Sequence, residues 1–179
     1  MFDPVPPFQA SEFRIKFAAS RWEREEAHAL RRAVFCGEQG LFDGDDRDPV
    51  DDYAILLVAV SMLGVAPDRV VGTVRIHEEA PGVWWGSRLA VDQDHRRIGA
   101  LGATLIRLAV SSARAMGCRT FLAHVQAQNE LLFHRLHWSS LGAMEFHGLP
   151  HVKMQADLAH YPPCHSPELG FVALPRKAA

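Results

Sequence analysis

A glycine-containing turn with two adjacent arginines is the part of the chain best suited to bind an anion. Arg96 and Arg97 precede Gly99 and Gly102, and the turn joins an apolar segment ending at Val91 to a second apolar segment with helical spacing. Backbone N–H groups at the start of a helix attract phosphate, glycines let the backbone approach it, and guanidinium groups pair with its oxygens. The turn lacks the Walker lysine and the G-x-G-x-x-G fingerprint of dinucleotide-binding folds. It therefore predicts a phosphate-binding turn of another type.

A second charged stretch lies between Asp43 and Asp52, where six aspartates accompany a single arginine. A calcium loop needs glycine at its sixth position and glutamate at its twelfth, and this stretch has Asp48 and Ala54 there. We therefore expect no calcium site; a solvated loop and a functional acidic surface both stay open. The tail sequence HYPPCHSP holds possible zinc ligands but lacks four well-spaced ones, so no metal is predicted.

Apolar spacing, turn residues and capping residues predict the elements that position these side chains. Ser20 and Glu23 have capping-box spacing, which starts a helix that Gly37 is expected to end near Cys36. The expected order is β-α-β-β-β-α-β-α-β-β, a mixed sheet flanked by helices in one α/β domain. The other predicted elements are strands over 13–18, 53–60, 70–76, 83–91 and 120–125, helices over 100–116 and 129–138, and a hairpin over 143–158 that turns at 147–150.

Length and composition limit the class of protein. A chain of 179 residues, 48% of them apolar, suffices for one buried core, and we expect an irregular arm over 1–12, a domain over 13–158 and an irregular tail over 159–179. The longest apolar run, 54–60, is far shorter than the roughly 20 residues of a membrane span, and no signal sequence is evident, so we expect a cytoplasmic protein. Three scattered cysteines indicate reduced thiols, and a net charge of −2 gives no basis for nucleic-acid binding.

The turn and several other segments resemble the GNAT superfamily of N-acetyltransferases. Motif A of that superfamily reads (Gln/Arg)-x-x-Gly-x-(Gly/Ala). The better register starts at Arg97, which puts Ala100 where glycine is usual and Gly102 at the last position. The segments LRRAVFCGEQGLF, VVGTVRI and HGLPHVKM resemble segments of the ElaA-like branch in the same order. The chain is also similar to bacterial GNAT proteins encoded beside nitrilases, and the likeness covers residues 13–158.

This resemblance implies a mixed, mostly antiparallel sheet whose fourth and fifth strands splay apart to bind acetyl-CoA as co-substrate. The end of the fourth strand would pair with the pantetheine amides, the turn would hold the pyrophosphate, and an amine would attack the thioester directly. The residues implied to bind acetyl-CoA are Leu89, Ala90, Val91, Arg96, Arg97, Ile98, Gly99, Ala100, Leu101, Gly102, Ala103, Asn129 and Phe133.

The acid and base positions depart from the family pattern. Phe133 stands where the family usually has a tyrosine acid, and Gly86 corresponds to the glutamate found on the fourth strand of many relatives. Glu38 and His124 are therefore the candidate catalytic bases. A structural role competes in each case, because Glu38 could cap its helix or pair with Arg31, and His124 could be hydrogen-bonded in the core.

The leading interpretation is an acetyl-CoA-dependent N-acetyltransferase acting on a small amine, and the acidic stretch favours a cationic acceptor. A second is an acyltransferase similar to acyl-homoserine-lactone synthases, which share an arginine and Val-Phe before an acidic patch. A third is a degenerate GNAT domain that binds acyl-CoA as a sensor or partner subunit. The C-terminal hairpin could also pair two copies of the chain as a homodimer.

Overall fold

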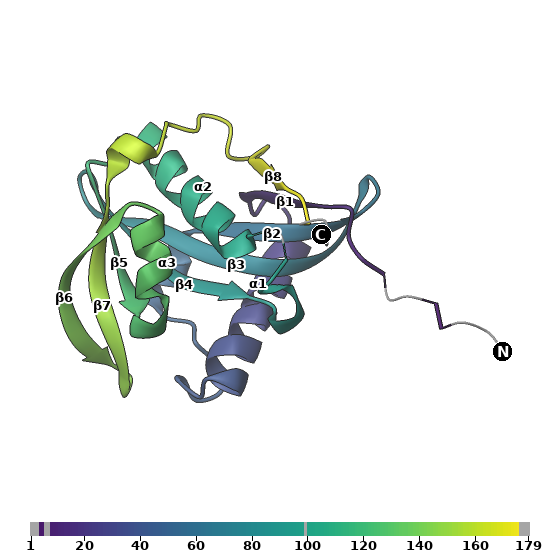
Figure 1. Ribbon diagram of the computed structural model, residues 1–179, viewed down its shortest axis with the longest axis horizontal. Helices are drawn as coiled ribbons and strands as arrows, with labels where there is room; N and C mark the ends of the chain where they lie inside the picture. Colours follow the sequence, from purple (N-terminus) through teal and green to yellow (C-terminus); the bar gives the residue numbers. More distant parts are fainter. Residues whose placement is uncertain (1–3, 6–7, 99, 176–179) are drawn as a thin grey trace.

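An eight-stranded sheet forms the centre of the molecule, a computed structural model that describes residues 4–5, 8–98 and 100–175 (Figure 1). The strands are β1 (Glu12–Phe17), β2 (Ile55–Leu63), β3 (Ala66–Ala80), β4 (Val83–Val91), β5 (Thr120–Gln126), β6 (Trp138–Phe146), β7 (Leu149–Ala156) and β8 (Phe171–Ala173). They lie in the order β6-β7-β5-β4-β3-β2-β1-β8, and only β4 and β5 are parallel among the described pairs. The predicted mixed, mostly antiparallel sheet is confirmed.

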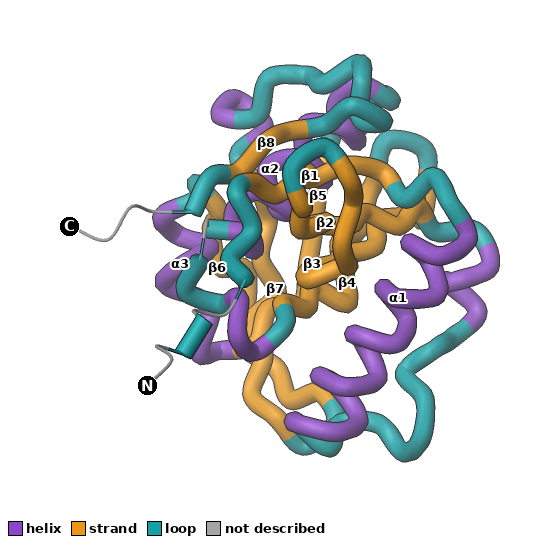
Figure 2. The backbone as a smooth tube through the Cα atoms, turned by 90° about the vertical axis from the view of Figure 1, so that its right-hand side faces the viewer, coloured by secondary structure: helices purple, strands orange, loops and turns teal. Residues whose placement is uncertain are grey.

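Helices cover both faces of this sheet, as the two views of the backbone show (Figures 1 and 2). They are α1 (Arg21–Arg31), η1 (Arg32–Glu38), α2 (Leu101–Ala115) and α3 (Glu130–Arg135), with short turns η2 (Pro49–Asp52), η3 (Gln93–His95), η4 (Ala127–Asn129) and η5 (Leu158–His160). Side chains of α2 and α3 share one apolar core with Trp84 and Phe121, and those of α1 form a second with Val58 and Val60. Within the described ranges, no helix has the length and apolar character required to cross a membrane.

The first helix begins as predicted but ends later. The Ser20 and Glu23 side chains form the expected capping box. After α1 the chain continues as the π-helix η1, so the expected end near Cys36 is wrong. The reason lies in the glycines: Gly40 takes the left-handed conformation that ends a helix, with φ of 60°. Gly40, and not Gly37 as predicted, therefore ends this helical segment.

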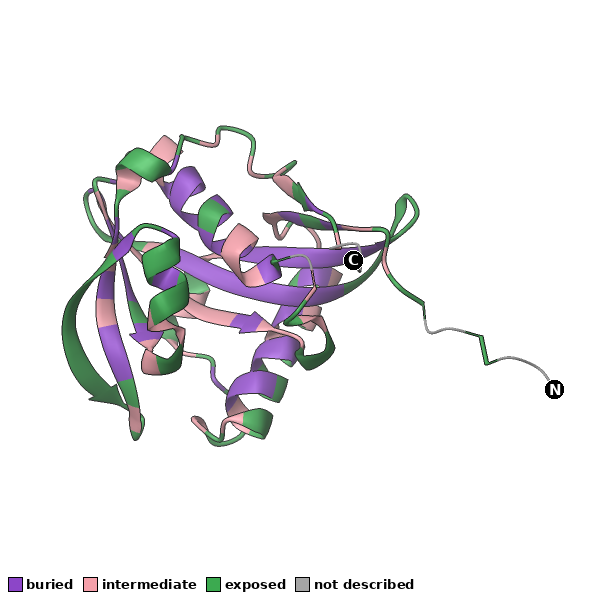
Figure 3. Ribbon diagram, viewed as in Figure 1, coloured by how far each residue is buried: buried purple, intermediate pink, exposed green. Residues whose placement is uncertain are grey.

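Two hairpins differ in length from their predictions. The stretch expected to join the second and third strands is itself paired as far as Leu63 and Ala66, because β2 and β3 continue to a tight turn. The β6–β7 hairpin turns at His147 and Gly148, with φ of 50° and 76°, inside the predicted turn. Beyond Trp138 the residues of β6 are exposed at the open edge of the sheet (Figure 3), and pairing of two copies there stays a prediction.

The C-terminal tail, residues 159–179, was expected to be irregular, but part of it forms a strand. Its segment β8 pairs antiparallel with β1, from Phe13 opposite Ala173 to Ile15 opposite Phe171. The intervening chain is fastened to α2, where the Cys164 N–H donates to the carbonyl of an α2 residue at 3.0 Å. This pairing covers β1, which would otherwise leave an open sheet edge.

The sheet opens between β4 and β5. Their ladder runs from Val83 opposite Thr120 to Gly86 opposite Ala123 and ends there. Beyond it β4 stays paired with β3 and β5 with β7, so the two strands diverge. A bulge at Arg88, whose φ is 56°, interrupts the β3–β4 ladder at the same level. The predicted splay of the fourth and fifth strands is confirmed.

Candidate active site

A cavity of about 570 Å³ opens where β4 and β5 diverge. Apolar side chains of α2 and α3, among them Ile106 and Phe133, form part of its wall. The rest comes from β3, β4 and β5, from the segment that follows η1, and from the turn between β6 and β7. This volume is within the range of small-molecule sites, and it suffices for a small acceptor next to the reactive end of a larger co-substrate.

The turn after β4 presents the start of α2. Ala100 precedes the helix in a left-handed conformation, with φ of 49° and ψ of 42°. Among the described residues no side chain caps the helix and its first turn carries no acidic residue, so the helix start suits an external anion. The left-handed backbone accounts for the usual glycine at this position and supports the register that begins at Arg97. Arg97 is exposed, and Gly99 lies outside the described residues.

Arg96 and Glu38 bind one another. The Arg96 guanidinium donates from Nη2 to Glu38 Oε2 at 2.6 Å and from Nε to the Val91 carbonyl at 3.1 Å. The ion pair therefore connects the end of η1 with the predicted phosphate turn. Glu38 does not line the cavity. The alternative pair of Glu38 with Arg31 does not form, because buried aspartates surround Arg31.

Four of the predicted site residues line the cavity: Leu89, His124, Asn129 and Phe133. Apart from Glu38 on η1 and Gly99, which lies outside the described residues, the others lie along the end of β4, the turn and the start of α2, outside this lining. They are Ala90, Val91, Arg96, Arg97, Ile98, Ala100, Leu101, Gly102 and Ala103. The predicted set therefore divides into a cavity group and a turn group, which meet at the end of β4.

His124 is the candidate base that faces the cavity. Its side chain is exposed, which contradicts the alternative of a hydrogen-bonded core histidine. Its ring lies 4.8 Å from the Trp85 ring between centroids. Partial burial lowers its pKa, and the nearby charge of Lys153 lowers it further. The neutral imidazole that results can accept a proton at neutral pH.

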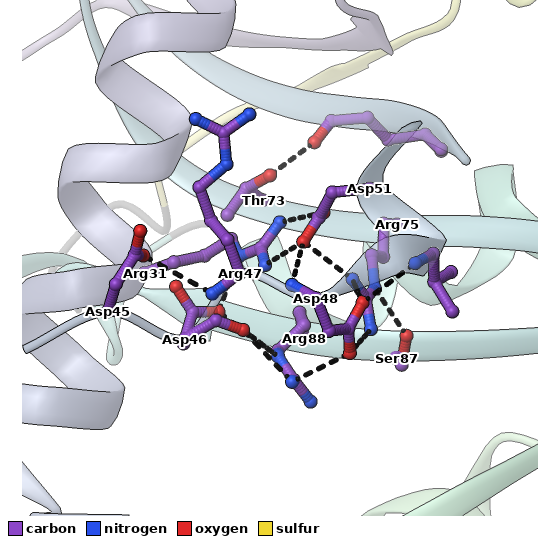
Figure 4. Close-up of polar contacts among 12 residues, drawn as sticks. Arg31, Asp45, Asp46, Arg47, Asp48, Asp51, Thr73, Arg75, Ser87 and Arg88 are labelled. Atoms are coloured by element: carbon purple, nitrogen blue, oxygen red, sulfur yellow. Dashed lines mark hydrogen bonds and ion pairs between the residues drawn. The ribbon is translucent and has the colours of Figure 1, made fainter. Parts of the chain in front are cut away.

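The acidic stretch is folded into a network of ion pairs with three arginines from α1, β3 and β4 (Figure 4). Arg31 is completely buried within it. The pairs are Arg31 with Asp46 (2.7 Å) and Asp51 (2.7 Å), Arg75 with Asp48 (2.7 Å) and Asp51 (2.8 Å), and Arg88 with Asp46 (3.1 Å) and Asp48 (3.1 Å). The network fixes the stretch to both the first helix and the bulge of β4.

Three of the six aspartates are paired with arginines, which contradicts the expectation of a wholly solvated loop, whereas Asp43, Asp45 and Asp52 remain exposed. A cationic acceptor stays a prediction. Burial opposes ionisation of Asp51, but hydrogen bonds from Arg31 and from the Asp48 backbone hold the pKa of Asp51 well below its ordinary range. Hydrogen bonds from Arg75 lower the pKa of Asp48. Because three carboxylates face three guanidinium groups, the network presents little net charge to a ligand.

Comparison with known proteins identifies the family. The family model described as the acetyltransferase (GNAT) family matches residues 19–138, more than half of the chain. The chain belongs to the GNAT acetyltransferase family. A search of curated protein sequences finds no match.

Solved structures share the fold of this GNAT domain. A predicted N-acetyltransferase from Lactobacillus plantarum superposes with a TM-score of 0.71 at 25% identity, over 80% of this chain and 97% of the other. Escherichia coli ElaA has a TM-score of 0.67 at 18% identity, over 81% and 98%. The acyl-homoserine-lactone synthase LasI superposes with a TM-score of 0.66 at 16% identity, over 86% of this chain and 96% of the other. The expected likeness to ElaA is confirmed for the fold, and that to proteins encoded beside nitrilases stays a prediction.

The GNAT cavity has no tyrosine hydroxyl among its described lining residues. Phe133 is buried, with its ring 5.0 Å from that of Trp138 between centroids. Tyr161 accepts a hydrogen bond from Trp138 Nε1 at 2.9 Å and donates one to the Leu136 carbonyl, so its hydroxyl belongs to the core. Tyr53 is exposed and lies outside the cavity lining. Neither tyrosine is placed to protonate a thiolate in the cavity.

Gly86 is explained by packing. A Cβ atom at position 86 would stand 3.0 Å from Phe121 Cε1, so the ring would have to shift to admit one. The glutamate that many relatives carry at the corresponding position therefore does not fit here without repacking.

Further cavity residues lie on β3, where sequence reasoning gave His77 and Glu78 as weaker candidate bases and missed Arg75 and Glu79. Arg75, His77 and Glu79 all line the cavity, and they alternate along the strand. Trp85 Nε1 donates to Glu79 Oε2 at 2.8 Å, which places a carboxylate on the wall. Trp84 is buried in the core while Trp85 lines the cavity, as the alternation of a strand requires. The same alternation, applied from Arg75 onward, could have found Glu79.

Proposed function

We propose that this GNAT domain transfers the acetyl group of acetyl-CoA to the amine of a small acceptor by direct attack. The observation that carries the proposal is the opening of the sheet beyond Gly86 and Ala123, with a cavity at the opening and an α2 start that lacks a side-chain cap beside it. The turn around Arg97 holds the pyrophosphate, and the diverging end of β4 offers backbone groups to the pantetheine amides. The thioester then reaches the cavity past Leu89.

His124 is the proposed base. It takes a proton from the acceptor ammonium, and the freed lone pair attacks the thioester carbonyl carbon. Backbone N–H groups of β4 past Gly86, which have no β5 partner, are the nearest donors for the oxyanion. The C–N bond forms, the C–S bond breaks, and the electron pair leaves on sulfur. The proton that the new amide nitrogen sheds can return to the thiolate.

The leaving thiolate needs no tyrosine in this account. Thiols have pKa values near 8.5, so a thiolate is a moderate base and a good leaving group. The Phe133 ring instead keeps that part of the wall apolar. The missing hydroxyl also supports the second candidate, a degenerate domain that binds acyl-CoA as a sensor or partner subunit. Turnover separates the two.

The test is release of free thiol from acetyl-CoA in the presence of small amines, compared among wild type, His124→Gln and Glu38→Gln. We expect release by wild type, a loss of about 100-fold or more in turnover for His124→Gln, and near-normal turnover for Glu38→Gln. Equal rates for wild type and His124→Gln would remove His124 from the mechanism, and a large loss in Glu38→Gln would restore Glu38 as the base. Binding of acetyl-CoA without release from any amine would favour the sensor, and release only from an acyl-carrier-protein thioester would favour the lactone-synthase alternative.

A further inference from the structure

Aromatic rings from four separate segments surround one part of the cavity. Phe42, in the segment after η1, contacts the ring of His147 with centroids 4.6 Å apart. His147 contacts Phe146 at 4.4 Å, and Phe146 stacks with His124 at 6.1 Å. His124 in turn meets Trp85 at 4.8 Å. All five rings line the cavity, so they form a continuous aromatic wall from β4 to the segment after η1.

The charges beside this wall are compensated. The guanidinium of Arg88 lies 4.4 Å over the Phe42 ring and pairs with two aspartates of the buried network. Of the other charged lining residues, Arg47 is exposed and Glu79 accepts from Trp85 Nε1. Among the described lining residues, Arg47 and Glu79 therefore leave no surplus of negative charge outside the network. The cavity therefore offers a polyamine little electrostatic attraction, whereas a flat, apolar ligand can pack against several of its aromatic rings.

We propose that the acceptor is a primary arylalkylamine, an amine carried by a short alkyl arm on an aromatic or heteroaromatic ring. This inference rests on the proposed acetyltransfer and names its substrate class. The amine lies at the Trp85 end of the wall, where His124 can take its proton and the Glu79 carboxylate can pair with the ammonium. The ring lies toward Phe42 and His147.

The position of the splay supports this orientation. Trp85 pairs with Leu122 in the β4–β5 ladder, and the ladder ends one residue later, at Gly86 and Ala123. His124 is the next residue of β5, so the Trp85 end of the wall stands at the opening through which the thioester enters. Phe42 and His147 belong to a loop and a hairpin turn at the other end of the series of ring contacts, and Phe42 also packs against the Arg88 guanidinium of β4. An amine at His124 therefore lies next to the residue where the β4–β5 ladder ends, with its ring directed along the wall.

The test is the specificity of acetyl transfer, measured by thiol release with phenethylamine, 2-cyclohexylethylamine and spermidine. The first two amines have similar size and charge and differ in the π faces of the ring. We expect a kcat/KM for phenethylamine about 10-fold above that for 2-cyclohexylethylamine, the effect of one or two aromatic pairs, and a weaker reaction still with spermidine. The preference should reside mainly in KM, because ring contacts bind ground and transition states alike.

Two variants locate the preference. Phe42→Leu keeps apolar volume but removes a ring, and His147→Asn removes the second ring with a residue that accepts a left-handed backbone. Each should reduce the preference for phenethylamine several-fold, while the matched control Phe8→Leu, at an exposed position in the N-terminal arm, should leave it unchanged. Circular dichroism will show whether Phe42→Leu folds. If it folds poorly, the preference measured with His147→Asn decides whether the aromatic wall recognises the acceptor ring.

The outcomes separate the two proposals. Thiol release that is as efficient with 2-cyclohexylethylamine or spermidine as with phenethylamine overturns the aromatic acceptor and leaves acetyl transfer standing. Failure of acetyl-CoA to bind overturns the acetyl transfer and, with it, this inference. If acetyl-CoA binds but no amine reacts, titration of phenethylamine into protein saturated with CoA decides: saturable binding that His147→Asn weakens supports the aromatic site, and no binding overturns it.

Discussion

Two groups of arginines lie near the diverging end of β4, one in the buried ion-pair network and one in the turn before α2, and their surroundings differ. Arg31 and Arg75 are buried, with relative exposures of 0% and 3%, and carboxylates hold every charged end. Arg96 and Arg97 are exposed at the turn, and Arg96 has a single carboxylate partner, Glu38. The first group binds the protein to itself. The second can exchange its partners for a phosphate.

A charged residue in the sequence can be assigned a role only once its partners in the fold are known. The aspartates appear as an acidic surface along the chain, yet in the fold three of them meet arginines that lie far away in sequence. Arg75 reaches Asp48 across 27 residues and Arg88 reaches Asp46 across 42. Near the turn, by contrast, Glu38 is the one carboxylate that pairs with Arg96 among the described residues, and the first turn of α2 carries no acidic residue. One group therefore governs stability, and the other ligand binding.

The largest effect on stability is expected from Arg31→Met. Removing this guanidinium leaves Asp46 buried with one remaining cation, and loss of one partner of a buried pair costs about 3–5 kcal/mol of unfolding free energy. Urea denaturation measures this change in the free energy of unfolding. The control is Arg21→Met, which removes an exposed ion pair with Glu25 and should change little. Similar unfolding curves for the two variants would show that the buried network is not what holds the loop.

A smaller effect, with its own pH signature, is expected from Asp51→Asn. The folded-state pKa of Asp51 is depressed, so its ionisation stabilises the fold above the unfolded pKa of about 4 and this contribution is lost as the pH falls through the folded pKa. At pH 7 the variant should be about 3 kcal/mol less stable than wild type. The gap should begin to narrow below about pH 4, where unfolded wild-type Asp51 takes up a proton that the folded protein does not, and it should close only below the folded pKa. Thermal unfolding from pH 7 into the acid range below pH 4 tests this, and a gap independent of pH would contradict it.

The smallest effect on stability and a clear one on binding are expected from Arg97→Met. This exposed arginine should be removable with no measurable change in unfolding, while affinity for acetyl-CoA falls about 10-fold, or about 1.4 kcal/mol. The wild-type affinity should also weaken with salt more steeply than that of the variant. Unchanged affinity in calorimetric titration would place the pyrophosphate elsewhere.

Sequence patterns predicted the parts of the molecule whose determinants are local. The order of elements, the Ser20 cap and the turn before α2 follow from residues within a few positions of each other. Ala100 takes the left-handed conformation that glycine favours, which explains why glycine is usual at this position of motif A. The glycines near the end of the first helix show the limit, since the pattern permits either Gly37 or Gly40 as the terminator and only Gly40 of the two takes the left-handed conformation.

Contacts between residues far apart in the chain could not be predicted from the sequence. The pairing of β8 with β1 joins Ala173 to Phe13, and no spacing in the sequence indicates a three-residue strand so far away. The ion-pair network could not be predicted for the same reason, because it depends on which strands become neighbours. The aromatic wall needed the fold as well, since Phe42 and His147 meet only when the hairpin turn reaches the segment after η1. Alternation along β3 was readable, and it would have placed Glu79 on the cavity face.

The central claim is that the turn before α2 binds acetyl-CoA, and isothermal titration with Gly102→Glu tests it most directly. A Cβ at Gly102 meets only Val91 Cγ2, at 3.9 Å, so the variant should fold while its carboxylate occupies the anion site. Gly142→Glu, on exposed β6 with no atom within 4 Å of its Cβ, is the matched control. The account predicts micromolar binding by wild type and control and none by Gly102→Glu. Equal affinity of all three proteins would contradict it.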